Sequence, residues 1–169
     1  MSWALGTAAR IDALTDGIGR AASWLALAIA LLMSGNVLLR YAFDTGSVWS
    51  QELEWHLLAP LVLVGMSYAL RHGEHVRVDV LYARYGARGQ AAVDLLSALL
   101  ALAFALFIVK VSLPYVMAAW SIGESSSDPG GLPHRALLKG LIPLGFALFA
   151  LQSLAGALQA AVRLRRVAS

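Results

Sequence analysis

The sequence contains no cysteine, which excludes disulfide bonds and thiolate metal sites from its 169 residues. Charged residues are also scarce, at 14%, whereas a soluble domain carries about 25%. Hydrophobic residues make up 59% of the chain, and its mean hydropathy is +0.70. This balance indicates a protein built for lipid.

Patterns typical of enzymes and of nucleic-acid binding are missing as well. There is no Ser, His and Asp order of a hydrolase, no phosphate-binding loop and no carboxylate pair in a cleft-forming fold. The net charge is +3 and the isoelectric point is near 9.6, but the basic residues lie between apolar runs and form no stripe. We therefore expect no enzymatic activity, no nucleic-acid partner, and no cofactor or metal.

Four apolar runs are long enough to cross a bilayer, for which a helix needs about 20 residues. They predict an all-α integral membrane protein with a single domain over residues 1–169. The expected transmembrane helices cover about residues 21–40, 50–70, 92–122 and 137–162. Residues 10–20 carry apolar and acidic side chains on opposite sides, which predicts a short amphipathic helix at the inner surface. Residues 123–133 are rich in Gly, Pro and Ser and predict an irregular loop.

The distribution of lysine and arginine predicts the orientation of these spans. The side with more basic residues holds Arg10, Arg20, Arg71, Arg77, Arg84, Arg88, Arg163, Arg165 and Arg166. The opposite side holds only Arg40, Arg135 and Lys139. Because the richer side of a membrane protein is cytoplasmic, we expect both termini inside the cell.

Polar residues gather where the first two spans meet the outer surface. Asn36 and Arg40 share one helix face, so Asn36 would bond a neighbouring helix while Arg40 reaches the outer headgroups. A second interpretation, compatible with the first, is that Arg40 meets Glu52 or Glu54 across the hairpin and fixes it. Glu52 and His56 also share a face, which is either a polar cap that docks another subunit or, less favoured, a cation site or proton relay.

Two further polar features lie in the inner loop and in the third span. His75, Arg77 and Asp79 alternate with apolar residues and would share one side of an extended segment. A metal site built from His72 and His75 is a weak alternative to a solvated loop. Lys110 is the deepest cation, and it either meets a carbonyl or carboxylate within a complex or marks a helix end that projects from the bilayer.

These residues alone predict an accessory or scaffolding subunit. One alternative is a haem-binding membrane anchor of a redox complex, with His56 and His134 as ligands. Another is an independent small exporter, although the carboxylates stay at the edges of the spans and no inverted repeat is visible.

The order of several short motifs resembles the DctQ family, the small membrane subunits of tripartite ATP-independent periplasmic (TRAP) transporters. The motifs are Asn36, Arg40, Tyr41 and Phe43; Trp49, Glu52 and Trp55; Gly65, Arg71, His75, Arg77 and Asp79; residues 129–133; and residues 142–146 with Gln152. The resemblance extends from about Asp12 to Arg163.

The resemblance implies a four-helix subunit of the bacterial inner membrane with both termini inside. Its partners would be a large DctM-type membrane subunit, which holds the substrate and sodium sites and moves by an elevator mechanism, a periplasmic substrate-binding protein, and membrane lipid. The small subunit would scaffold the large one and help to dock the binding protein during uptake of an organic acid. Residues 126–133 and 138–143 resemble the branch linked to keto acids, mannitol and chloroaromatic acids.

The same resemblance assigns two groups of partner-binding residues. The outer group, at docking or intersubunit contacts, is Arg40, Trp49, Glu52, Glu54 and Trp55. The inner group, which would form a brace, is Arg71, His75, Arg77 and Asp79.

Overall fold

The computed structural model describes residues 2–74 and 82–168, and within them the chain forms four long helices. These are α1 (Ser2–Phe43), α2 (Val48–His72), α4 (Ala87–Ser121) and α5 (Arg135–Ala168). Each is long and apolar enough to cross a membrane, and no strand occurs within the described ranges. The prediction of an all-α protein with four membrane-spanning helices is confirmed.

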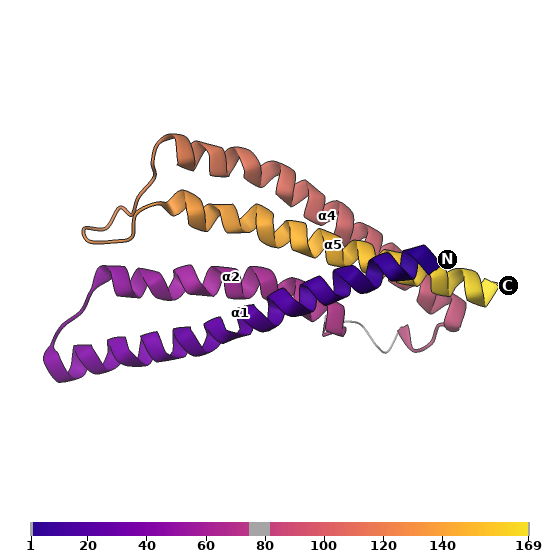
Figure 1. The fold of residues 1–169 in the computed structure, drawn as a ribbon, viewed down its shortest axis with the longest axis horizontal. Helices are drawn as coiled ribbons and strands as arrows, with labels where there is room; N and C mark the ends of the chain where they lie inside the picture. The colour runs from indigo at the N-terminus through magenta and orange to yellow at the C-terminus, as the bar shows by residue number, and fades with distance from the viewer. Residues whose placement is uncertain (1, 75–81, 169) are drawn as a thin grey trace.

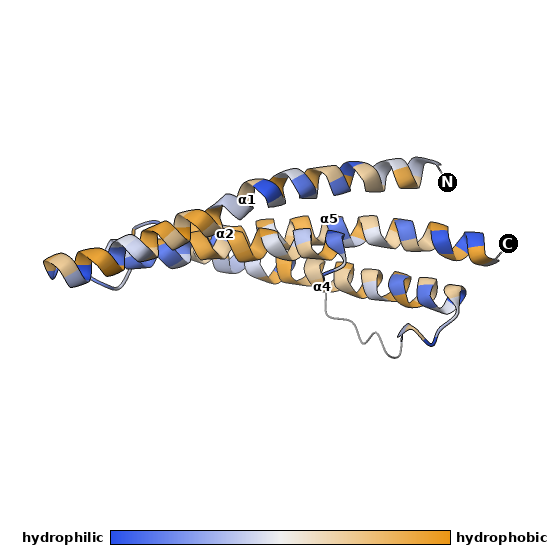
Figure 2. Ribbon diagram, turned by 90° about the horizontal axis from the view of Figure 1, so that it is seen from below, coloured by the Kyte–Doolittle hydropathy of each residue, from blue (hydrophilic) through white to orange (hydrophobic). Residues whose placement is uncertain are grey.

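The helices form two hairpins that are joined through α5. Helix α4 makes its most extensive contact with α5, α1 packs on α2, and both α1 and α2 also contact α5. Figure 1 shows both termini at one end of the molecule and the connections 44–47 and 122–134 at the other. We call these the terminal end and the loop end. Figure 2 shows hydrophobic residues along the middle of the helices and hydrophilic residues toward their ends.

Helix α5 is the centre of the bundle, and small side chains let its neighbours approach it. Its buried positions include Ala150, Ala155, Ala157 and Ala160. An alanine core removes little apolar area from water, but it allows helix backbones to pack closely, as is typical of membrane proteins. The bundle therefore depends on close helix contact and on polar links between helices.

The expected amphipathic segment 10–20 is continuous with the first span and does not form a separate helix. Helix α1 runs for 42 residues, about 63 Å, without a proline to interrupt it. Leu14 and Ile18 are exposed on one side, whereas Thr15 and Gly19 on the other are buried in the bundle. Gly19 is required for this packing, since a Cβ there would lie 2.2 Å from the Tyr68 ring of α2.

Local sequence explains where α2 ends and how long α4 is. Helix α2 ends at Gly73, whose φ of 75° is the left-handed cap conformation that glycine favours. Helix α4 is 35 residues long, about 52 Å, and continues through Pro114 without a break. It therefore exceeds the roughly 30 Å hydrocarbon core, as its length in the sequence predicted.

Candidate functional site

Glu52, in the first turns of α2, holds the 122–134 loop at the loop end. Among the described residues, its side chain is the largest that is almost fully buried, at 2% exposure. One carboxylate oxygen accepts hydrogen bonds from the Ser126 hydroxyl and from Arg135 Nη2, the latter at 3.2 Å. The other oxygen accepts one from the backbone N–H of Leu132 at 2.5 Å. We call these four residues the Glu52 clamp.

The clamp has no room for a side chain at Gly131. A Cβ there would lie 2.4 Å from the Ser126 hydroxyl and 2.8 Å from Glu52 Oε2. The loop also bonds within itself, because Ser126 N donates to Leu132 O at 3.1 Å. Its irregular backbone, which the Gly, Pro and Ser content predicted, therefore has a fixed shape because these polar contacts replace those of a regular element.

Aromatic side chains border the clamp. The guanidinium of Arg135 lies 5.6 Å from the centre of the Trp55 ring, a cation–π distance. His56 packs edge-on against Trp55, and its Nδ1 lies 2.7 Å from the Glu52 carbonyl. Trp55 is about half exposed. The clamp thus ends in an aromatic surface that faces outward.

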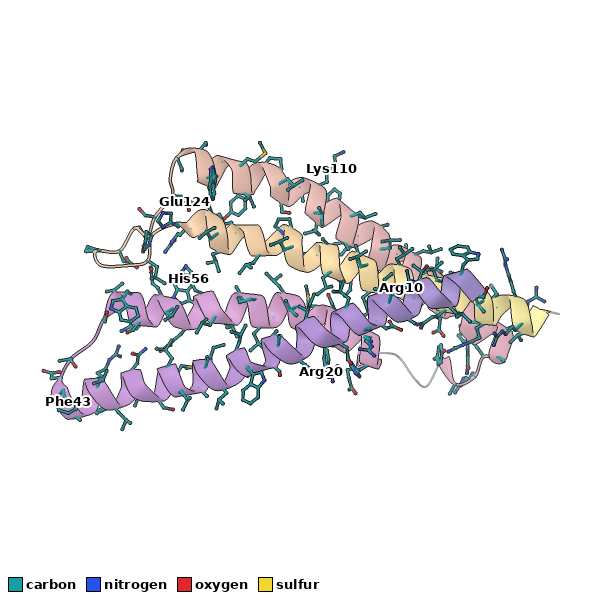
Figure 3. All side chains as sticks on the ribbon, viewed as in Figure 1. Arg10, Arg20, Phe43, His56, Lys110 and Glu124 are labelled. Carbon is teal, nitrogen blue, oxygen red and sulfur yellow. The ribbon has the colours of Figure 1, made fainter. Side chains whose placement is uncertain are left out.

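A second ion pair fixes the other end of the loop. Lys139 of α5 pairs with Glu124 at 2.5 Å, and its ammonium lies 4.1 Å from the centre of the Tyr115 ring of α4. Arg135 N donates to Glu124 O at 2.9 Å. The last turn of α4, the loop and the first turn of α5 therefore form one connected unit with α2. Figure 3 shows Glu124 and His56 on either side of the start of α5.

The partners of Glu54 and Glu52 test the two interpretations of the first hairpin. Asn36 Nδ2 of α1 donates to Glu54 Oε1 at 2.6 Å, so Asn36 does bond a neighbouring helix. The hypothesis that Arg40 meets Glu52 or Glu54 is wrong, because within the described residues neither carboxylate pairs with it. Glu52 turns toward the 122–134 loop, and Asn36, one turn before Arg40, takes Glu54. Arg40 is exposed beside Gly46.

Trp49 lies apart from the clamp. Together with Arg40, Asn36 and Gly35 it lines a hollow of about 380 Å³ between α1 and α2. Trp49 is also about half exposed. The outer group of candidate residues is therefore divided between two places at the loop end.

At the terminal end, Asp16 of α1 joins α1 to α2. It pairs with Arg71, with Arg20 at 3.1 Å and with His72 Nε2 at 3.6 Å. Arg71 thus braces two helices. His75, Arg77 and Asp79 of the expected brace lie outside the described residues, as does half of the weak His72–His75 metal site.

Two more carboxylates link the remaining helices at this end. Asp12 of α1 accepts hydrogen bonds from Gln152 and Gln159 of α5, at 2.8 and 2.9 Å. Asp94 of α4 pairs with Arg163 of α5 at 2.8 Å. Both carboxylates border a cavity of about 760 Å³ between the helices.

Sequence reasoning missed several of these partners. Ser126, Leu132 and Arg135 were assigned only to a loop and to an orientation count, although a buried carboxylate needs such donors. Gln152 and Gln159 are seven residues apart in an otherwise apolar helix, which puts them on one face. That spacing was the available signal for a shared partner on another helix.

Comparison with known proteins decides the family. The family profile described as "Tripartite ATP-independent periplasmic transporters, DctQ component" matches residues 29–163. The chain belongs to this family. The matched stretch contains the Glu52 clamp, the Asn36–Glu54 pair and the Lys139–Glu124 pair.

Three proteins similar to this chain are named as small permease proteins of TRAP transporters. It is 26% identical over 133 residues to the ectoine TRAP transporter small permease protein of Halomonas elongata, covering 77% of this chain and 68% of that protein. It is 33% identical over 88 residues to the C4-dicarboxylate TRAP transporter small permease protein of Vibrio cholerae, covering 52% and 38%. It is 29% identical over 124 residues to a putative TRAP transporter small permease protein of Haemophilus influenzae, covering 70% and 77%. These relatives are transporter subunits and not enzymes.

Proposed function

We propose that this chain is the small permease subunit of a TRAP transporter in the bacterial inner membrane. In this proposal it scaffolds a large DctM-type membrane subunit and helps to dock a periplasmic substrate-binding protein. The transporter takes up an organic acid by sodium symport. Membership of the DctQ family and the names of the three relatives support the role in a transporter. Two of those names specify ectoine and C4-dicarboxylates.

The observation that carries the docking role is the Glu52 clamp. A buried carboxylate with three donors holds an irregular loop in one shape at the end of the bundle. A loop that is already ordered loses less conformational entropy when a partner binds. The half-exposed Trp55 beside it supplies an aromatic surface, and aromatic residues are enriched in protein interfaces.

The proposed orientation puts this surface in the periplasm. Eight of the described basic residues flank the spans at the terminal end, so that end is cytoplasmic by the distribution of positive charge. The loop end is then periplasmic, where a soluble binding protein is available. Arg71, paired with Asp16, holds α1 to α2 on the cytoplasmic side and supports a rigid scaffold.

Affinity purification of the tagged chain from gently solubilised native membranes tests the scaffolding role. We expect one large polytopic membrane protein in about equal amount, identified by mass spectrometry. Recovery of the chain alone, or with redox proteins, would contradict the proposal. An absorption spectrum of the same sample separates the haem-anchor alternative.

Docking is tested with the binding protein encoded beside the recovered partner. Glu52→Lys reverses the buried charge of the clamp, and we expect it to weaken capture of the binding protein while the large subunit stays bound. Asp44→Lys is the matched control, since it reverses an exposed carboxylate at the same end of the molecule that belongs neither to the clamp nor to the outer group. Unchanged docking and unchanged complex yield for Glu52→Lys would remove the docking role of the clamp.

A further inference from the structure

Lys110 is a cation in the apolar part of α4. The preceding charge on this helix is Asp94, 16 residues earlier and about 24 Å away along the axis. The helix ends at Ser121, 11 residues later and about 16 Å away. A lysine side chain extends toward headgroups on a four-carbon stem, which is too short to cover this distance. A hydrocarbon core of about 30 Å centred on residues 95–121, which carry no other charge, ends about 12 Å beyond Lys110 along the axis. We therefore place the ammonium inside the core.

Lys110 also points away from the rest of the bundle. The buried residues Ala105, Ser112 and Ala119 mark the side of α4 that packs on α5. At about 100° per residue, these positions lie roughly 140–180° around the helix from Lys110. Figure 3 shows the side chain on the side of α4 away from α5. Among the residues that the structure describes, none forms an ion pair or hydrogen bond with it.

Three other cations next to the spans of this chain are paired with carboxylates. Arg135 pairs with Glu52, Lys139 with Glu124, and Arg71 with Asp16. Each of these cations has a carboxylate within the chain. Lys110 lies in less polar surroundings, and none of the described carboxylates pairs with it, so a costly charge faces the lipid.

The surface around Lys110 has the character of a helix contact. Between residues 96 and 117, the exposed residues within about 60° of it around the helix are Leu96, Leu99, Ala103, Leu106, Phe107, Leu113, Pro114 and Met117. We call them, with Lys110, the Lys110 face. An apolar stripe with one central cation is complementary to an apolar helix that carries one carboxylate.

We propose that the large membrane subunit packs on the Lys110 face and that one of its carboxylates pairs with Lys110 inside the membrane. This inference rests on the proposed function, because it requires that such a subunit exists. It adds the surface and the pairing chemistry of the contact. Intramembrane charges that persist are generally paired in this way.

Site-specific photo-crosslinking tests the surface. A photoreactive residue replaces Leu106 or Phe104 in the tagged chain, co-expressed with the large subunit. These positions are matched: they are two residues apart on α4, their exposed fractions are 55% and 56%, and they lie about 160° apart around the helix. Phe104 instead packs edge-on against Phe146 of α5. We expect the Leu106 variant to crosslink to the large subunit and the Phe104 variant not to.

Charge variants test the pairing. We expect Lys110→Glu to reduce co-purification of the large subunit by about tenfold or more, because it brings two carboxylates together in a dry contact. Lys110→Arg keeps the charge and should retain the complex. Arg88→Glu reverses an exposed charge on the same helix outside the apolar stretch and should also retain it. Equal abundance of the variants in the membrane shows that insertion is intact. The compensating variant replaces the carboxylate of the large subunit at the crosslinked site by lysine. Recovery of co-purification when this variant is combined with Lys110→Glu would establish the pair.

Several outcomes would overturn the inference while leaving the proposed function standing. They are crosslinks from Leu106 only to phospholipid, crosslinks only to a second copy of this chain, equal crosslinking from Phe104, and wild-type co-purification of Lys110→Glu. If the unaltered chain recovers no large subunit, the proposed function itself fails and this inference falls with it.

Discussion

Replacing Glu52 by glutamine removes the negative charge of the clamp at almost constant shape. The carboxylate accepts from three donors with two oxygens, whereas an amide offers one oxygen and one NH₂. At least one donor then faces another donor in a site that is 2% exposed. A hydrogen bond to a charged group contributes about 1.5–3 kcal/mol. We expect the closed loop to lose about 2–3 kcal/mol, which raises the open fraction roughly 30- to 150-fold.

Hydrogen–deuterium exchange of the purified protein measures this change directly. The Leu132 amide donates to Glu52, so the peptide that contains it should exchange faster in Glu52→Gln. Glu54→Gln is the control, and it should leave this peptide unchanged while loosening the Asn36 contact. Exchange of the Leu132 peptide at the wild-type rate in Glu52→Gln would refute the reasoning that the carboxylate holds the loop.

Two further predictions concern helix packing and orientation. Gly19→Ala places a Cβ 2.2 Å from the Tyr68 ring, so we expect a loss of about 1–3 kcal/mol and a lower thermal midpoint than for Gly17→Ala, where nothing lies within 4 Å. Equal midpoints would mean that the α1–α2 contact is looser than described. Because the chain has no cysteine, a single Cys in place of Ser127 should react with a membrane-impermeant maleimide in intact cells, and one in place of Ala87 only after permeabilisation. The reverse pattern would overturn the proposed orientation.

The helices could be predicted from the sequence because their signal is local. Each apolar run predicted a span, and each observed helix covers its predicted span to within one residue and extends beyond it. The placement of Glu52 near the start of a helix followed from the length that α2 needs to span the bilayer. These inferences depend on composition over about 20 residues and need no knowledge of neighbouring helices.

The partners within the site depend on how each helix is rotated, which no single run of sequence contains. Glu52 and Arg135 are 83 residues apart, and choosing Arg135 over Arg40 requires the positions of α2, α5 and the loop together. The acidic side of segment 10–20, which includes Asp16, was recognised, but the ion pair of Asp16 with Arg71 depends on this segment continuing into the first span as one helix. The spans were thus predictable, whereas the contacts between them were only partly so.

The central position of α5 has a consequence for how the protein is made. Helix α5 follows the other three in chain order, and α4 has its most extensive contact with it. During synthesis, α1 and α2 can pair as soon as both are inserted, but α4 must wait in the lipid without its main neighbour. Until α5 is inserted, the newly made protein therefore lacks the contacts that close the bundle, and apolar and polar surfaces that α5 later covers stay open.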